Sequence, residues 1–433
     1  MNHNTDNPKD KSEEIEKPGT NERRFTASRV NTFASFRIPA FRTYYISMIG
    51  NWFAMSMQML IRSLLIYRLT DSATMVGIIS LANAVPTILI SLLGGAIADR
   101  IQNKYILLYC RGISALITLG VAITLTTGYL SREHYGSYWI LIVASICDGA
   151  VNGFLTPTNT SIIPEIVGSK YVMNGISLSQ MGQNIFRLIG PMVAGFLIDQ
   201  YDFAHVYFLM AALNTIAAII TIFLPRTSTK IVRGGNALKD TVAGLKYLGS
   251  DTIILLVVIF GICHVVAGQP FHQLLPVFTE SILKVSASKL SILSAISAAG
   301  ALVASIAIAS LPNKKKGLIM LLSGVVMSVP IVLFCIFPQW HLAIFMMPFI
   351  GFGPTMHGTM ASTIVQTYAD PNYRSRMQSF ITMSMALATF GTFLAGILSD
   401  IFGIQWAVGS MALFLALVSF GFLAFVPKLR KLE

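Results

Sequence analysis

Long apolar stretches constrain what this chain can fold into more than any other feature. Each of twelve stretches has about 20 or more mostly apolar residues, enough for a helix to cross roughly 30 Å of hydrocarbon. They run approximately over residues 43–67, 73–98, 105–127, 138–162, 175–198, 204–224, 252–279, 288–311, 317–337, 342–367, 377–399 and 404–426. The sequence does not show the alternating pattern of short membrane-barrel strands. It therefore predicts an all-α membrane protein with twelve transmembrane helices.

The amino-acid composition supports a lipid bilayer as the surroundings of these helices. Hydrophobic residues make up 54% of the chain, charged residues 12%, and the mean hydropathy is +0.67. A soluble domain needs a polar exterior, which so few charged residues do not supply. We therefore expect a multi-pass membrane protein in direct contact with the lipid bilayer.

The net charge of +12 follows the predicted topology and does not indicate a nucleic-acid partner. With the amino terminus in the cytoplasm, most of the 31 Lys and Arg residues fall on the cytoplasmic side. The loops on the other side contain Arg68, Arg132, Lys284 and Lys289. This asymmetry is the positive-inside bias of membrane proteins. It predicts a protein of the cell (inner, cytoplasmic) membrane with both termini in the cytoplasm.

Three segments outside the apolar stretches are polar. Residues 1–36 mix basic and acidic side chains and contain few aromatics, which predicts a disordered cytoplasmic tail; a role in trafficking or partner binding is the alternative. Residues 225–251 form a predicted cytoplasmic linker. Within it, one helical face carries Leu238, Val242, Leu245 and Leu248, which predicts an amphipathic helix on the membrane surface. Residues 427–433 form a second cytoplasmic tail.

An internal repeat predicts how the twelve helices are organised. The fifth stretch ends in GPMVAGFLID, from Gly190 to Asp199, and the eleventh ends in GTFLAGILSD, from Gly391 to Asp400. The offset is 201 residues throughout. Parallel six-helix halves with a substrate path between them are one design of secondary transporters. We therefore predict two pseudo-symmetric six-helix bundles, over residues 37–224 and 252–426.

The loop after the second stretch carries a nameable motif. Its sequence GGAIADRIQNK, from Gly94 to Lys104, resembles the signature loop of the major facilitator superfamily, although Asn103 stands where a basic residue is usual. The resemblance implies the major facilitator fold and a cluster of gating charges, Asp99, Arg100 and Lys104, which Arg111 is placed to join. The alternative is a purely topological anchor that holds the loop inside.

Further segments resemble the drug and siderophore efflux branch of this superfamily. They are LTDS at 69–72, IPEIV at 163–167, LPVF at 275–278, and the pair Gly190-Pro191 followed by Ala194-Gly195, which is similar to an antiporter motif. Phe186 and Ser177 depart from that motif. The resemblance implies efflux by proton antiport. The alternative is that Gly190, Pro191 and Gly195 only allow close helix packing and a bend.

Polar side chains on apolar helices are the candidates for the substrate cavity. Since Asn and Gln rarely face lipid, we expect many of them to line a path. They are Asn51, Gln58, Asn152, Gln180, Gln183, Asn184, Gln269, Gln273 and His357. Abundant Met and aromatic residues nearby suit a small amphipathic organic molecule better than a dense anion. The alternative role for each residue is a hydrogen bond between helices.

Two opposite charges lie well inside apolar stretches and form a predicted pair. Counted from the same membrane face at 1.5 Å per residue, Asp148 is about 15 Å deep and Arg187 about 16 Å deep. An unpaired charge at that depth costs at least about 2.5–3.5 kcal/mol on insertion scales. The pair would be either a static salt bridge or a coupling site in which Asp148 exchanges Arg187 for a proton or a cationic substrate group.

These observations predict a secondary active transporter rather than an enzyme. The sequence contains no GxxxxGK[ST] signature, so a gradient must drive transport. Proton antiport is favoured, with sodium coupling or facilitated movement as alternatives. A lysophospholipid or other lipid flippase and an uptake symporter are the rival functions. We expect a monomer without a cofactor or metal, and we interpret the four cysteines as buried hydrophobic residues.

Overall fold

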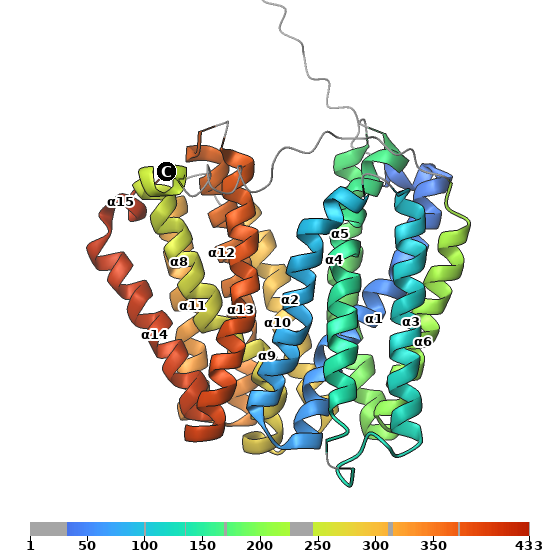
Figure 1. The fold of residues 1–433 in the computed structure, drawn as a ribbon. Helices are drawn as coiled ribbons and strands as arrows, with labels where there is room; N and C mark the ends of the chain where they lie inside the picture. The colour runs from blue at the N-terminus through green and yellow to red at the C-terminus, as the bar shows by residue number, and fades with distance from the viewer. Residues whose placement is uncertain are drawn as a thin grey trace, which may run out of the picture.

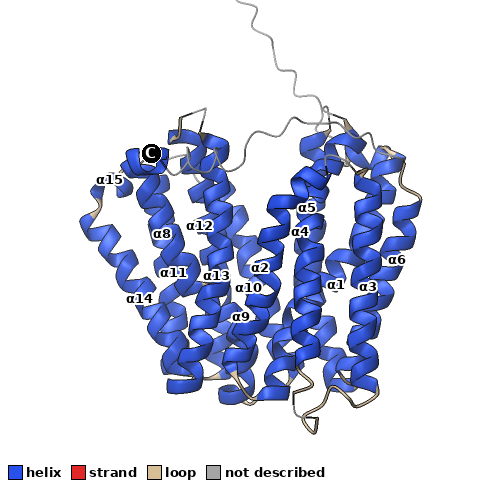
Figure 2. Cartoon of the chain, viewed as in Figure 1, coloured by secondary structure: helices blue, strands red, loops and turns tan. Residues whose placement is uncertain are grey.

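The computed structural model describes residues 33–98, 101–134, 136–168, 171–225, 246–310, 315–370 and 373–432. Across these residues the chain is helical and contains no strand (Figure 2). The predicted tail at 1–36 and the predicted amphipathic helix of the linker lie largely outside the described residues. Leu248, at the end of the linker, is buried among the helices that follow it.

The helices form two successive groups (Figure 1). The first group contains η1 (Ala34–Arg37), α1 (Pro39–Thr70), α2 (Ala73–Ala98), α3 (Asn103–Thr126), α4 (Trp139–Val167), α5 (Val172–Gln200) and α6 (Phe203–Ile222). The second group contains α8 (Thr252–Gly268), α9 (Pro270–Phe278), the π-helical turn η2 (Thr279–Leu283), α10 (Ala287–Ser310), α11 (Lys316–Ile336), α12 (Trp340–Tyr368), α13 (Arg374–Phe402), α14 (Ile404–Phe425) and α15 (Pro427–Arg430).

The helices match the predicted membrane spans closely. Ten of them, counting α8, α9 and η2 as one continuous segment, are long and apolar enough to cross a membrane. The remaining two long helices, α1 and α12, have 32 and 29 residues and pack inside the same groups. The all-α membrane fold is therefore confirmed, and the structure is consistent with the predicted count of twelve.

The seventh predicted span differs from the structure in its continuity. The sequence predicts one helix over residues 252–279, but α8 ends at Gly268 and α9 begins at Pro270. Proline lacks a backbone N–H and clashes with the preceding turn, so it interrupts a helix. Pro276 lies inside α9, and the π-helical turn follows directly after it.

The two groups pack their helices in the same order. In the first group α2 packs on α4, α3 on α6, and α1 on α5 and α6. In the second group α10 packs on α12, α11 on α14, and α8 on α13 and α14. Between the groups, α2 contacts α13 and α5 contacts α10. Each contact has a counterpart in the other group, as the sequence repeat predicts.

Buried apolar residues form three cores, and their positions show where the groups meet. The largest core takes side chains from both groups, including Leu64 and Ile198 of the first and Leu274 and Ala287 of the second. The other two cores each belong to one group: one contains Phe41 in α1, near the start of the described chain, and the other contains residues of α15, near its end.

The groups are therefore joined at one end of the helices and have separate cores at the other. We call the joined end, where α1 leads into α2 and α5 into α6, the closed end. The start of α1 and the carboxyl terminus lie at the opposite end, toward which the two groups diverge (Figure 1).

Candidate functional site

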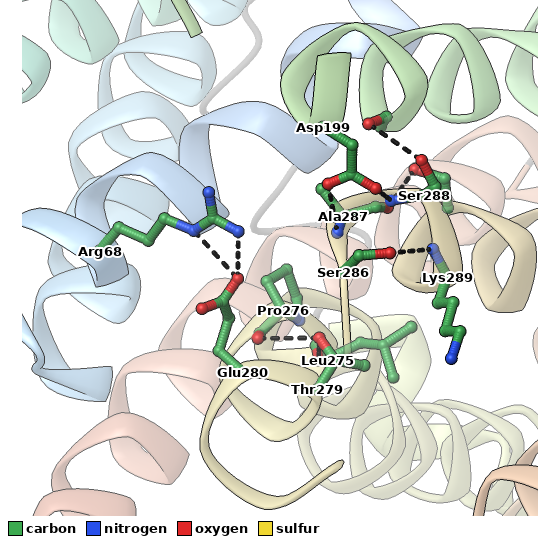
Figure 3. A network of polar contacts seen from close by, with 12 residues as sticks. Arg68, Asp199, Leu275, Pro276, Thr279, Glu280, Ser286, Ala287, Ser288 and Lys289 are labelled. Carbon is green, nitrogen blue, oxygen red and sulfur yellow. Dashed lines mark hydrogen bonds and ion pairs between the residues drawn. The ribbon is translucent and has the colours of Figure 1, made fainter. Parts of the chain in front are cut away.

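Two aspartates hold the groups together at the closed end. Asp199, at the end of α5, accepts hydrogen bonds from the backbone N–H groups of Ala287 (3.0 Å) and Ser288 (2.9 Å), at the start of α10 (Figure 3). Such bonds satisfy the free N–H groups of a helix N-terminus, and the carboxylate charge matches the helix dipole. The first group thereby caps a helix of the second.

Asp400, at the end of α13, makes the equivalent contact in the opposite direction. It accepts hydrogen bonds from the backbone N–H groups of Ala73 (2.8 Å) and Thr74 (3.0 Å) and from the hydroxyl of Ser72 (2.6 Å). The second group thereby caps α2 of the first. The two copies of the repeat thus form two equivalent contacts between the groups.

A salt bridge adds a third contact between the groups at the closed end. Arg68 of α1 donates from Nε to Glu280 Oε1 of η2 at 2.9 Å, and its Nη2 contacts the same oxygen (Figure 3). Both side chains are partly exposed, so the pair is worth on the order of 1 kcal/mol or less. It links α1 to the interrupted seventh span.

Two repeat glycines let the helices of opposite groups approach closely. A Cβ on Gly195 would meet Ser291 Oγ and lie 2.5 Å from the carbonyl oxygen of Ala287 in α10. A Cβ on Gly396 would lie 2.6 Å from the carbonyl oxygen of Ala73 in α2. Gly190 and Pro191 of the same predicted motif are also buried, but Gly190 packs against Ser56 of α1, within its own group.

A buried carboxylate marks the interior of the first group. Asp148 of α4 is 4% exposed and accepts a hydrogen bond from Gln58 Nε2 of α1. Arg62, one turn further along α1, is close enough to act electrostatically on Asp148 and on the buried Tyr207 of α6. Next to Asp148, Gly149 permits close packing of α4 on α2, because a Cβ there would collide with the backbone of α2.

The predicted ion pair between Asp148 and Arg187 is not formed in the described conformation. The ion pairs within the described part of the chain join other residues, and Asp148 is held from α1 instead. The prediction compared only the depths of the two residues in the membrane. It did not consider the direction in which each side chain points around its helix axis. The main partner of α4 is α2, whereas α5 packs chiefly on α1 and α10, and α4 and α5 share only a small contact. Arg187 is exposed and acts electrostatically on His272, in the second group.

The predicted cavity residues fall into four environments. Gln180 and Gln183 are exposed on α5, and Gln58 is bonded to Asp148. The half-buried members are Asn51, Asn152, Asn184, Gln269 and Gln273. His357 does not fit a cavity wall in this conformation: it is 4% exposed and stacks on His264 with ring centroids 4.4 Å apart, between α8 and α12 of the second group.

Of the predicted gating cluster, Asp99 and Arg100 lie outside the described residues. Lys104 donates to the carbonyl oxygen of Ile222 (2.6 Å), at the end of α6, where a cation is favoured. Arg111 is fully buried; it donates to Ala217 O at 3.3 Å and contacts Thr221 and Met48. In the described structure both residues therefore fasten α3 to its neighbours in the first group.

Sequence reasoning missed the role of Asn103, the residue that departs from the family loop. Its Nδ2 donates to Glu165 Oε1 of α4 (2.9 Å), and Ser161 donates to its Oδ1 (3.3 Å). Asn103 therefore links α3 to α4 by uncharged donors. Glu165 stands in the IPEIV segment, whose resemblance to the efflux branch gave no hint of this contact with the loop after α2.

Residues 44–392, well over half of the chain, match the Major Facilitator Superfamily. The chain belongs to this superfamily. Its members are transporters rather than enzymes, so the protein is a multi-pass membrane transporter, as predicted. The match runs through both groups and includes the loop at 94–104.

Curated relatives of this chain include siderophore transporters. The enterobactin exporter of Salmonella typhimurium is 23% identical over 347 residues, covering 79% of this chain and 81% of that protein. The staphyloferrin A transporter of Staphylococcus aureus is 22% identical over 365 residues, covering 83% and 87%. The efflux-type resemblance predicted from the sequence is confirmed by these relatives.

Solved structures confirm the fold. The nucleoside transporter NupG superposes with a TM-score of 0.74 at 15% identity, covering 89% of this chain and 99% of that one. A bacterial homologue of the lysosomal transporter Spinster, in an inward-facing and unoccupied conformation, gives a TM-score of 0.68 at 13% identity, covering 90% and 97%. At these identities the likeness concerns the fold alone.

Proposed function

We propose that this protein exports a small amphipathic organic molecule of the siderophore class by proton-coupled alternating access. The observation that carries the proposal is the joint at the closed end, where Asp199 and Asp400 each cap a helix of the opposite group. Contacts of this kind can break and reform as a unit. Breaking them, while the far ends of the groups meet, would expose the path between the groups to the other side of the membrane.

The orientation of the protein follows from the positive-inside bias. The closed end faces away from the cytoplasm, both termini lie in the cytoplasm, and the separate cores belong to the cytoplasmic end. In this conformation the path is open inward. One chain supplies both groups, so the protein works as a monomer in the inner membrane.

Asp148 is the proposed proton-binding residue. It is the acidic side chain buried deepest in the helices of the described part, and Gln58 and Arg62 from α1 surround it. A proton on Asp148 would release Arg62 from its electrostatic attraction and change how α1 packs on α4. Ionisable groups inside transmembrane helices mark proton paths in many transporters.

Asp148→Asn separates coupling from folding. An amide oxygen can still accept the hydrogen bond from Gln58, so we expect the variant to fold and to exchange substrate down a gradient. Uphill export driven by an imposed proton gradient should fall to background. Normal uphill export by Asp148→Asn would rule out this residue as the coupling site.

Transport in proteoliposomes tests the function itself. Enterobactin, staphyloferrin A and lysophosphatidylglycerol are offered in turn, with and without a proton gradient. We expect gradient-dependent movement of a siderophore that stops when the gradient is collapsed. Movement of the lysolipid alone would favour the flippase. Movement of a siderophore in the same direction as the protons would favour an uptake symporter. Movement of a siderophore that does not depend on the proton gradient would leave only sodium coupling or facilitated exchange.

A further inference from the structure

Arg187 is a cation near the middle of α5 for which the described structure supplies no anion. At 1.5 Å per residue it lies roughly 20 Å from either end of the helix, too far for its head group to reach the membrane surface. Its side chain is exposed in the isolated chain. A charge at this depth is expensive and is found facing a protein interior or a polar path.

Arg187 lies on α5, the helix of the first group that packs on α10 of the second group. Its electrostatic neighbour is His272 of α9, in the second group. On its own helix it has Gln183 and Gln180 as exposed neighbours, one and two turns away. Seven residues return a helix to within about 20° of the same direction, so Gln180 and Arg187 lie on one face. On α9, Gln273 follows His272 and is half-buried.

Three acidic side chains of the described helices that could have balanced this charge already have other partners. Asp148 accepts from Gln58, Glu280 pairs with Arg68, and Asp199 caps α10. The positive charge of Arg187 is therefore uncompensated in the described conformation. The neighbouring glutamines add neutral hydrogen-bond donors without adding an anion.

We propose that Arg187 anchors a binding site for an anionic oxygen group of the transported molecule, with Gln180, Gln183 and His272 around it. The planar guanidinium binds a carboxylate or another pair of anionic oxygens through two parallel hydrogen bonds. Because donors come from both groups, a bound anion supplies the missing charge and links α5 to α9. The proposal rests on the proposed export function, since it assigns the charge class of the substrate.

The test uses three probes with one apolar body: 1-naphthylacetate, its uncharged amide, and a naphthylmethyl trimethylammonium cation. Binding is measured by equilibrium dialysis to the full-length protein in nanodiscs of neutral phosphatidylcholine. We expect the carboxylate to bind about tenfold or more tightly than the amide, the range for hydrogen bonds to a charged group. Arg187→Gln should abolish this preference, and Arg187→Lys should keep part of it.

Two controls make the result specific to this residue. Arg430→Gln removes an exposed arginine of α15 and should leave the preference unchanged. Retained binding of the amide and an unchanged unfolding temperature show that Arg187→Gln is folded. If Arg187→Gln unfolds, Arg187→Met, which keeps the apolar stem, replaces it in the same comparison.

Equal binding of carboxylate and amide, binding of neither, or a preference that survives both neutral variants would overturn the proposal.

A competition experiment identifies the source of the anionic group, with lysophosphatidylglycerol added as the competitor. If it displaces the probe at a lower concentration than 1-naphthylacetate does, the anionic group is assigned to a lipid head group. If it displaces the probe more weakly, the group is assigned to a soluble organic anion. Binding is measured without any gradient. If the protein exports its substrate but does not prefer the carboxylate over the amide, this site alone is refuted. If it prefers the carboxylate but does not export, the proposed function alone is refuted.

Discussion

Asp199 and Asp400 stand 201 residues apart, and each caps a helix of the opposite group with its carboxylate. Neither aspartate holds its own bundle together. The two contacts lie at one end of the molecule with the Arg68–Glu280 pair, so the joint between the groups is concentrated there. A conformational change that opens this end must break all three contacts.

Asp400→Ala should shift the population toward states in which the closed end is open. Losing an N-cap costs about 0.5–2 kcal/mol, and here the loss falls on the joined conformation. The measurement is the distance distribution between spin labels at Tyr201 and Phe402, equivalent and exposed positions of the two groups. We expect the population at longer distances to grow.

Asp202→Ala is the matched control for this experiment. Asp202 caps α6 by accepting from His205 N at 3.0 Å, within the first group. Its loss should lower stability by a similar amount without moving the labels apart. A shift of the same size in both variants would mean that the cap at α2 has no special part in closure.

Gly195→Ala should disfavour the closed joint through steric contact. The added methyl group meets Ser291 and the backbone of Ala287 in α10, and backbone cannot turn away as a side chain can. We expect longer distances between the same labels and slower transport. Gly120→Ala in α3 is the control, since nothing lies within 4 Å of its Cβ; it should raise helix stability by up to about 1 kcal/mol. A harmless Gly195→Ala would show that the helices can separate locally without cost.

A pair of double-mutant cycles distinguishes the observed contact of Asp148 from the one predicted by depth. Asp148→Leu combined with Gln58→Leu should show a coupling of about 0.5–3 kcal/mol, because the two residues are bonded. Asp148→Leu combined with Arg187→Gln should be additive within about 0.5 kcal/mol. Chemical unfolding in mixed micelles supplies the free energies. The opposite pattern would restore the Asp148–Arg187 pair.

The sidedness of the membrane topology is tested by cysteine labelling. In a variant whose Cys110, Cys147, Cys263 and Cys335 are replaced by serine or alanine, Glu133→Cys should react with an impermeant maleimide on whole cells. Lys428→Cys should react after permeabilisation and not before. Both sites are exposed, so access depends on the membrane alone. The reverse labelling would invert the proposed orientation.

The sequence predicts the helices well because length and hydrophobicity decide them. The second predicted span covers 73–98, and α2 occupies Ala73–Ala98. The repeat ending in Asp199 and Asp400 is also visible in the sequence, but its meaning is not. Capping depends on which helix N-terminus lies opposite, and this is a property of the packed bundle rather than of either segment.

The candidate site is predicted less completely, because the rotation of a helix is set by packing. Residue counting gives the depth of Asp148 and Arg187 but not the direction in which each side chain points. Gln58 stands out in the sequence as a polar residue on an apolar helix, and its partner becomes clear only once α1 is placed beside α4. The stacking of His357 on His264 likewise joins α12 to α8 across a distance that no spacing in the sequence reveals.

The reciprocal caps have the form of an isologous contact in a twofold dimer. In such a dimer the same carboxylate of each subunit would cap the same helix of its neighbour, once in each direction. Here α5 and α13 supply the carboxylate, and α10 and α2 present the N-terminus. A duplicated and fused six-helix ancestor would therefore have inherited its inter-subunit contact intact, with the symmetry axis now running between two parts of a single polypeptide.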